Sequence, residues 1–454
     1  MTMAYYLICF EYFFAGLISK VSPEQRVPRT TPEQLVSVTH PGNTEPDIRY
    51  GYDAKGNRTS VRTPSGTTAY AYDELNRLRT VTEPDGMSET AYTYDTVGNR
   101  KTVTCPNGTE TEYFYDDLNR LEGMENRKAD GTLISSYEYD LGDAGNRLSV
   151  TENTGRVVNY DYDDLYRLVG EEILDPTSGN ETVSYTYDDF GNRLSKTDAT
   201  GTTSYHYDDN DQLYAEILPD GTTVSYGYDD NGNTLTKGDG TYTTTYSWDS
   251  ENRLISVDDG VSVTDYEYDA DGVRVSAETD GEVTIYLVDK NRDYAQVLED
   301  RDGSGGLIVA YVYGDDLVRQ VRGGVLSYYH YDGQLSVRQL SDADGDVSDD
   351  YVYDAFGALL GQSGDTVNDY LYTGEQFDEA VDGYYLRARY YDQGTGRFVS
   401  SDPWQGRINE PMTLHKYLYA NANPIINRDP SGYNQCRFLK KIKECQTESL
   451  AVFF

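Results

Sequence analysis

This chain has few of the residues from which metal, redox and phosphate sites are built. Its 454 residues include four cysteines and four histidines, and the cysteines form no Cys-x-x-Cys pair. The histidines lack metal-ligand spacing, and no glycine-rich phosphate loop or Gly-x-Ser-x-Gly elbow stands out. Two acidic loops, 300–304 and 342–346, lack the spacing and terminal Glu of an EF-hand, so we interpret them as turns. We therefore predict no cofactor and no metal site.

Positive charge is also scarce. The chain carries 38 Lys and Arg against 78 Asp and Glu, which gives a net charge of −40. Binding to phosphates or to anionic membrane surfaces needs clusters of Lys and Arg. Nucleic acid is therefore not an expected partner, and we interpret the acidic excess as a contribution to solubility.

Long apolar runs are missing as well. Residues 4–18 are apolar and aromatic, but Glu11 interrupts them and the segment is too short to span a bilayer. A secretory signal needs a positive start and a small-residue cleavage site, which this segment meets poorly. Residues 23–46 contain five prolines and are interpreted as a linker. No helical apolar rhythm is sustained between 47 and 372, which argues against long helices.

Tyrosine, by contrast, is abundant, with 45 residues against 11 Phe. The motif Tyr-x-Tyr-Asp recurs about every twenty residues, from Tyr50–Asp53 to Tyr266–Asp269. One copy, at 246–249, carries Trp248 in place of the second tyrosine. A fixed period of this length indicates one supersecondary unit that is stacked many times.

The residues after each motif predict a β-hairpin. Most copies continue into Gly-Asn-Arg or Leu-Asn-Arg, and many reach an Asp-Gly pair before the next strand. These residues favour tight turns, and strand side chains alternate, so both rings should lie on one face. The alternation of the two turn sequences suggests that the unit is a pair of hairpins. We interpret the tyrosines as packing ladders; the alternative is that ring edges bind sugars on an exposed face.

A denser segment follows residue 372. It contains Arg387-Ala388-Arg389-Tyr390-Tyr391-Asp392, Ser401-Asp402-Pro403 and Asp429-Pro430-Ser431-Gly432. Together with the array, these motifs resemble the RHS or YD-repeat family and its RHS-repeat-associated core, over about residues 47–433. The resemblance implies an all-β fold in which the hairpins spiral into a hollow shell, either complete or open, and the core plugs one end.

The same resemblance divides the chain into four parts. Residues 1–46 are the apolar segment and linker, 47–372 the YD-repeat shell, 373–433 the RHS-repeat-associated core, and 434–454 a short variable tail. It also implies secretion or display at the cell surface, as in most relatives.

The core resembles a self-cleaving aspartyl peptidase. The resemblance assigns Asp402 and Asp429 as the catalytic pair, Arg389 as the supporting charge, and Tyr433–Asn434 as the scissile bond. Two carboxylates held close cannot both ionise cheaply, so one stays protonated while the other activates water. The alternative is structural: Arg389 and Asp402 form a buried ion pair, and Asp429 only begins a turn.

The implied function is a toxin-delivery shell that encloses its own C-terminal segment as cargo and releases it by autoproteolysis. The 21 residues from 434 onward are too few to fold alone, so we expect the cargo to be truncated or lost. An open spiral exposes strand edges, which favours a second polypeptide that completes the shell. The alternative is an extracellular or cell-surface protein that binds a partner or surface glycans without cleavage.

Overall fold

The computed structural model describes residues 34–39, 47–407, 409, 411–433 and 436–437. This part of the chain is almost entirely β, as predicted, with three short 3-10 elements: η1 (Tyr372–Gly374), η2 (Pro411–Leu414) and η3 (Ala420–Ala422). None of its helices is long and apolar enough to cross a membrane. The apolar N-terminal segment considered as a signal, Asn434 and the tail from 438 lie outside the described residues.

One 31-stranded antiparallel sheet contains the array. Its strands are β1 (Ser37–Val38), β2 (Ile48–Tyr52), β3 (Arg58–Thr63), β4 (Gly66–Tyr72), β5 (Leu78–Thr82), β6 (Glu89–Tyr94), β7 (Arg100–Thr104), β8 (Glu110–Tyr115), β9 (Leu121–Arg127), β10 (Leu133–Leu141), β11 (Arg147–Glu152), β12 (Val157–Tyr162), β13 (Leu168–Leu174), β14 (Glu181–Tyr187), β15 (Arg193–Asp198), β16 (Gly201–Tyr207), β17 (Leu213–Ile217), β18 (Thr223–Tyr228), β19 (Thr234–Gly238), β20 (Thr243–Trp248), β21 (Leu254–Asp258), β22 (Val263–Tyr268), β23 (Arg274–Thr279), β24 (Glu282–Asp289), β25 (Gln296–Asp302), β26 (Leu307–Tyr313), β27 (Leu317–Arg322), β28 (Val325–Tyr331), β29 (Val337–Ser341), β30 (Val347–Tyr353) and β31 (Leu359–Ser363).

Two small sheets follow the array, and the second pairs a core strand with two residues of the predicted tail. One consists of β32 (Gln376–Asp378), β33 (Gly383–Tyr385), β34 (Tyr390–Asp392) and β35 (Arg397–Phe398), and the other of β36 (Asn427–Arg428) and β37 (Cys436–Arg437). At the other end, β1 lies within the predicted linker and pairs with β2. The linker interpretation therefore does not hold for that short stretch.

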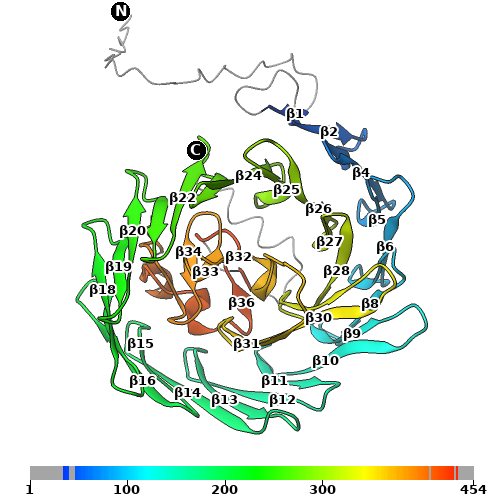
Figure 1. Cartoon of the computed structure of the whole chain (residues 1–454). Coiled ribbons are helices and arrows are strands. Elements are labelled where there is room, and N and C mark those ends of the chain that lie inside the picture. Colours follow the sequence, from blue (N-terminus) through cyan, green and yellow to red (C-terminus); the bar gives the residue numbers. More distant parts are fainter. Residues whose placement is uncertain (1–33, 40–46, 408, 410, 434–435, 438–454) are drawn as a thin grey trace, which may run out of the picture.

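The large sheet curls around the core (Figure 1). Each strand pairs with its neighbour in the chain, and among the described residues no pairing joins β31 back to the first strands. The sheet is therefore an open spiral. In Figure 1, β24 to β31 lie inside the arc formed by the first strands, and the core lies inside both.

Each Tyr-x-Tyr-Asp motif leads into a turn that we call the YD turn, from the motif Asp to the first residue of the next strand. In the turn that starts at Asp95, the Oδ1 atom of this residue accepts hydrogen bonds from the backbone N–H groups of Val97 and Asn99, at 3.0 and 2.8 Å. The third residue after the Asp has positive φ, which Gly98 adopts without strain. In the next turn Asn119 occupies that position. The two turn sequences are thus two solutions to one backbone requirement.

Consecutive YD turns are also paired through side chains. Asn99 Nδ2 donates to Asn119 Oδ1 at 3.0 Å. The same bond recurs from Asn57 to Asn76 and from Asn233 to Asn252. These bonds support the pair of hairpins as the structural unit.

The second ring of the motif closes the open end of its hairpin. Its hydroxyl donates to the carbonyl of the first residue in the neighbouring strand, as from Tyr72 to Arg58 at 2.8 Å. The same bond joins Tyr94 to Leu78, Tyr162 to Arg147, Tyr187 to Leu168, Tyr207 to Arg193, Tyr228 to Leu213, Tyr268 to Leu254, Tyr331 to Leu317 and Tyr353 to Val337. At the exceptional copy, Trp248 Nε1 donates to the carbonyl of Thr234 at 2.7 Å.

A β-bulge precedes the second ring in these motifs. The register shifts between Ala71 and Tyr72, and again between Gly227 and Tyr228. A bulge bends its strand and increases the local twist. Because the shift recurs with the motif, the bending accumulates along the array, which explains why the sheet curls.

The curled sheet packs against itself. Tyr50 OH donates to Asp289 Oδ1 at 2.8 Å, and Ser135 Oγ donates to Gln339 Oε1 at 2.8 Å, so β24 to β31 form an inner layer against the first strands. First rings of the motif from both layers share one hydrophobic core. The rings therefore serve as packing, in agreement with the interpretation made from the sequence.

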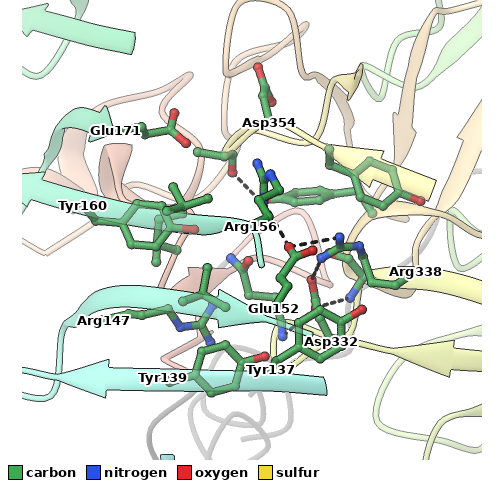
Figure 2. A pocket seen from close by; sticks show the side chains of 18 residues that line it. Tyr137, Tyr139, Arg147, Glu152, Arg156, Tyr160, Glu171, Asp332, Arg338 and Asp354 are labelled. Carbon is green, nitrogen blue, oxygen red and sulfur yellow. Dashed lines mark hydrogen bonds and ion pairs between the residues drawn. The ribbon is translucent and has the colours of Figure 1, made fainter. Parts of the chain in front are cut away.

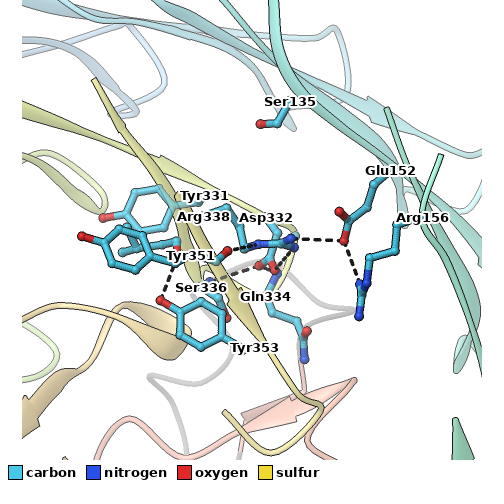
Figure 3. A network of polar contacts seen from close by, with 12 residues as sticks. Ser135, Glu152, Arg156, Tyr331, Asp332, Gln334, Ser336, Arg338, Tyr351 and Tyr353 are labelled. Atoms are coloured by element: carbon cyan, nitrogen blue, oxygen red, sulfur yellow. Dashed lines mark hydrogen bonds and ion pairs between the residues drawn. The ribbon is translucent and has the colours of Figure 1, made fainter. Parts of the chain in front are cut away.

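Buried charges cross between the two layers near β11 and β29. Arg338 Nη2 lies 3.2 Å from Glu152 Oε1, and its Nη1 lies 3.6 Å from Asp332 Oδ2 (Figure 3). Arg156 contacts the same Glu152 oxygen at 3.0 Å. These side chains line a cavity of about 40 Å³ (Figure 2), which has the size and polarity to hold water.

We expect Trp248→Phe to destabilise the protein more than Trp248→Tyr. Both changes shrink the ring, but only Tyr keeps a donor for the Thr234 carbonyl. An unsatisfied carbonyl costs about 1 to 2 kcal/mol. Urea denaturation followed by circular dichroism measures the difference in free energy of unfolding. Equal stability of the two variants would contradict the role given to this bond.

Candidate functional site

The core is attached to the inner face of the sheet by buried cations. Arg274, from a YD turn, places Nη1 2.5 Å from Asp378 Oδ2 and 2.9 Å from Tyr390 OH. Its Nη2 donates to Gln376 Oε1 at 2.8 Å. We call the 31-stranded sheet the wall. The Arg274 guanidinium therefore joins the wall to β32 and β34 of the core.

A second attachment uses a turn asparagine. Asn192 Oδ1 accepts hydrogen bonds from Arg397 Nη1 and from His415 Nε2, both at 2.8 Å. Burial and the nearby Arg397 and Arg389 hold the pKa of His415 well below its ordinary value. His415 Nδ1 accepts two backbone N–H bonds. His415 is thus a neutral structural group.

The three side chains that the sequence assigns to the site lie together. Arg389 Nη2 is 2.9 Å from Asp402 Oδ2 and 3.6 Å from Asp429 Oδ2. The side chains of Arg389, Asp402 and Asp429 are 3, 10 and 5 % exposed. Two buried carboxylates therefore share one cation.

Arg389 is held on every side. Its guanidinium carbon lies 3.6 Å from the centre of the Phe398 ring. Nη1 donates to the Lys416 carbonyl at 3.1 Å, and Nε donates to the Gly432 carbonyl. The position of the Arg389 guanidinium is therefore set by the core itself, through the Phe398 ring and two main-chain carbonyls.

Asp402 is anchored through its backbone and its second oxygen. Its N–H donates to the Lys416 carbonyl at 2.9 Å, and Oδ1 accepts from the Trp404 N–H at 2.8 Å. Lys416 Nζ in turn donates to the Asp402 and Trp404 carbonyls. Burial raises the pKa of Asp402 to about 6; Arg389 and the Trp404 N–H oppose this rise, and Asp429 adds to it. This carboxyl group changes charge near neutral pH.

Asp429 begins a tight turn that ends against Arg389. Ser431 Oγ donates to Asp429 Oδ1 at 3.0 Å and accepts the Tyr433 N–H at 3.2 Å. Gly432 has φ +70°, and a Cβ there would lie 2.6 Å from the Leu386 carbonyl oxygen. Only glycine fits this position, which explains the last residue of the Asp-Pro-Ser-Gly motif.

Sequence reasoning missed several supporting residues. Arg387 Nη1 donates to the Pro430 carbonyl at 2.7 Å and forms an ion pair with Glu375. Lys416 and Phe398 position Asp402 and Arg389, as described above. Arg387 lies in the Arg-x-Arg motif and was open to recognition there, whereas no local pattern marks Glu375 or Lys416.

A pocket of about 200 Å³ adjoins this cluster. Its core side consists of Ala388, Arg389, Ser400, Ser401, Pro403 and Tyr433. Its other side consists of two YD turns, through residues 251–253 and 270–272. The pocket therefore lies between the core and the wall. Of the predicted scissile bond, Tyr433 lines the pocket, and Asn434 lies outside the described residues.

Metal-binding groups are not gathered anywhere in the described ranges. No set of three or more His, Cys, Asp or Glu side chains there is arranged to hold an ion. In the acidic loops, Asp302 and Asp342 accept backbone N–H bonds as turn residues do. Burial raises the pKa of the Cys105 thiol to about 12, so it is not a reactive thiolate at neutral pH.

Two protein-family models match the chain, and together they cover most of the array and the core. The teneurin YD-shell family model matches residues 144–425, more than half of the chain. The RHS repeat model matches residues 34–68 and 72–110.

Two curated relatives are bacterial nucleases. The tRNA3(Ser)-specific nuclease WapA of Bacillus spizizenii is 36% identical over 146 residues, which are 31% of this chain and 6% of that protein. The tRNA nuclease WapA of Bacillus subtilis is 34% identical over 146 residues, with the same shares. This chain therefore spans a small part of the length of these relatives.

Solved structures share the fold over most of the chain. The TcdB2-TccC3-Cdc42 crystal structure has a TM-score of 0.69 at 20% identity and covers 85% of this chain and 21% of its own. The Photorhabdus luminescens Tc holotoxin pore with mutated TccC3 has a TM-score of 0.69 at 20% identity, with coverage of 87% and 22%. At this identity the likeness shows the fold alone.

We expect Arg274→Ala to loosen the core from the wall. The change leaves Asp378 buried without its cation, which costs about 3 to 5 kcal/mol. Arg77→Ala is the control, because Arg77 is also a YD-turn arginine, one position earlier in its turn, but pairs with the partly exposed Asp73, and its loss should cost at most about 1 kcal/mol. Hydrogen exchange of residues 376–392 measures the effect. Equal protection in both variants would contradict the attachment.

Proposed function

The chain belongs to the teneurin YD-shell family of RHS-repeat proteins, and on that premise we propose that its core is an aspartyl autoprotease inside a section of β-shell. The observation that carries the proposal is the pair of buried carboxylates on one Arg389 nitrogen. The turn that contains Asp429 leads directly to Tyr433, whose N–H is held by Ser431. The main chain up to Tyr433 is thus held beside the Arg389 that the pair shares, since Arg389 Nε donates to the Gly432 carbonyl.

The proposed reaction is hydrolysis of the peptide bond that follows Tyr433. The ionised carboxylate of the pair accepts a proton from water, whose oxygen attacks the carbonyl carbon. The protonated carboxyl group donates its proton as the carbon–nitrogen bond breaks and the amine leaves. Arg389 stabilises the ionised member, and burial keeps the second proton bound. Because the bond belongs to the same chain, positioning replaces substrate binding.

The released product is the segment that follows Tyr433, which we propose is the cargo. The core lies within the curled sheet (Figure 1), so a segment cut there starts within the wall. The relatives include proteins named as tRNA nucleases, and the structural neighbours include a toxin pore. These names support a role in extracellular toxin delivery, with the activity of the cargo itself open.

We further propose that another polypeptide of the same repeat fold covers the edge of the sheet where the YD turns lie. The second residue after the motif Asp is apolar and largely exposed in five turns, at Leu75, Val97, Leu118, Leu165 and Phe190. In the last repeat the same position is Phe356, which is 2% exposed and whose carbonyl accepts the Tyr391 hydroxyl of the core. These exposed apolar turn residues therefore correspond to a position that the core covers in the last repeat.

Cleavage is tested by the intact mass of the purified chain under denaturing conditions. We expect a large fragment that ends near Tyr433 and a small C-terminal peptide. Asp402→Asn should slow cleavage by at least about a thousandfold, because the pair loses a member that ionises. Asp220→Asn, in an exposed turn, should cleave like the parent. An uncut parent, or an Asp402→Asn variant that cleaves normally, would sink the proposal.

The cleavage rate should fall as pH rises through about 6. The pKa of Asp402 is raised from 3.8 to about 6, so the pair keeps its shared proton below that pH and loses it above. Uncut chain recovered in denaturant is diluted into buffers between about pH 5 and about pH 8, and cleavage is followed by gel. Each unit above about pH 6 should slow the reaction about tenfold. A rate that rises with pH would be inconsistent with a carboxyl acid.

A further inference from the structure

We infer that the pocket between the core and the wall is a binding site for the side chain of residue 433, so that two repeats of the shell complete the cleavage site. The inference rests on the proposed autoproteolysis. It assigns to the repeats a role in the reaction that the core alone cannot supply. The ligand class is a tyrosine side chain from the same chain, whose ring is bulky and whose hydroxyl suits a lining that includes Asn252 and Ser401.

The core side of the pocket is continuous with the proposed catalytic pair. Ser401 and Pro403 flank Asp402 in sequence, and Ala388 precedes Arg389. The Ala388 N–H donates to the Ser431 carbonyl at 3.3 Å, within the turn that leads to Tyr433. Tyr433 itself lines the pocket and is 44% exposed. Residue 433 therefore lies against a space of about 200 Å³.

The wall side is braced rather than loose. Arg253 Nε donates to Asp249 Oδ2 at 2.6 Å within its own turn, and its Nη1 donates to the Asp269 carbonyl of the next turn at 3.3 Å. Lys290 Nζ then joins Asp269 at 2.8 Å and also contacts Asp271. Two neighbouring YD turns are thereby locked together where they face the core. A wall fixed in this way can hold a side chain in one position.

Position matters because cleavage within one chain depends on geometry. A misplacement of about 1 Å can slow a positioned reaction by about a hundredfold. If the two turns seat residue 433, cleavage requires the wall to be folded against the core. Release of the segment would then follow assembly of the shell, which prevents cleavage in a partly folded chain.

The test fills the pocket from the wall side. Ala270 is an exposed turn residue that lines the pocket, and Ala54 holds the same position after the motif Asp in a distant turn. We expect Ala270→Trp to slow cleavage by at least about tenfold, Ala270→Leu to slow it less, and Ala54→Trp to leave it unchanged. Thermal melting of each variant, made also with Asp402→Asn to keep the chain intact, reports folding.

The outcomes separate the two levels of the proposal. A cleaving parent with slowed, folded Ala270 variants supports the composite pocket. Should Ala270→Trp fail to fold, the milder Ala270→Leu carries the comparison. If folded Ala270 variants cleave at the parental rate, the inference is wrong and autoproteolysis stands. If the parent itself stays whole, the proposed function fails, and the inference fails with it.

Discussion

A hydrogen bond from a ring to a main-chain carbonyl closes most hairpins of this wall. A strand end with a free carbonyl would fray, and here the second ring of most motifs supplies the donor. Phenylalanine would pack equally well but has no donor, which explains why tyrosine is so frequent. Trp248 confirms the chemistry, since a different ring donates the same bond through its indole nitrogen. The β-bulge beside that ring then gives the sheet its bend.

The bend brings together residues that are far apart in the chain. Because the sheet curls, the inner layer meets the first strands, and the core meets the wall. Several polar groups buried at these contacts form specific pairs, such as Tyr50 with Asp289 and Arg274 with Asp378. The wall therefore both surrounds the core and positions it, because its turns supply the partners of core side chains.

The sequence motifs identified some residues of the candidate site and missed others. The resemblance named Asp402, Asp429 and Arg389, and the structure places all three in one buried cluster. Their catalytic role stays a prediction until cleavage is measured. Lys416 escaped sequence reasoning because its partners are main-chain carbonyls. Glu375 escaped it because its partner is an arginine in another strand connection of the core. Neither kind of contact leaves a periodic signal in the sequence. The pocket turns escaped it because their sequences are ordinary copies of the repeat.

The sequence by itself determined the local structure, because a turn and a strand depend on residues a few positions apart. The Asp acceptors, the positive-φ Gly or Asn, and the alternating rings all act within one repeat. Because this local pattern recurs, the sequence was sufficient to predict the array of hairpins. The tertiary structure alone decided which copies face solvent and which face the core. Phe190 and Phe356 occupy the same turn position, yet one is exposed and the other buried. That difference arises from the accumulated curvature of the sheet, which no single repeat encodes.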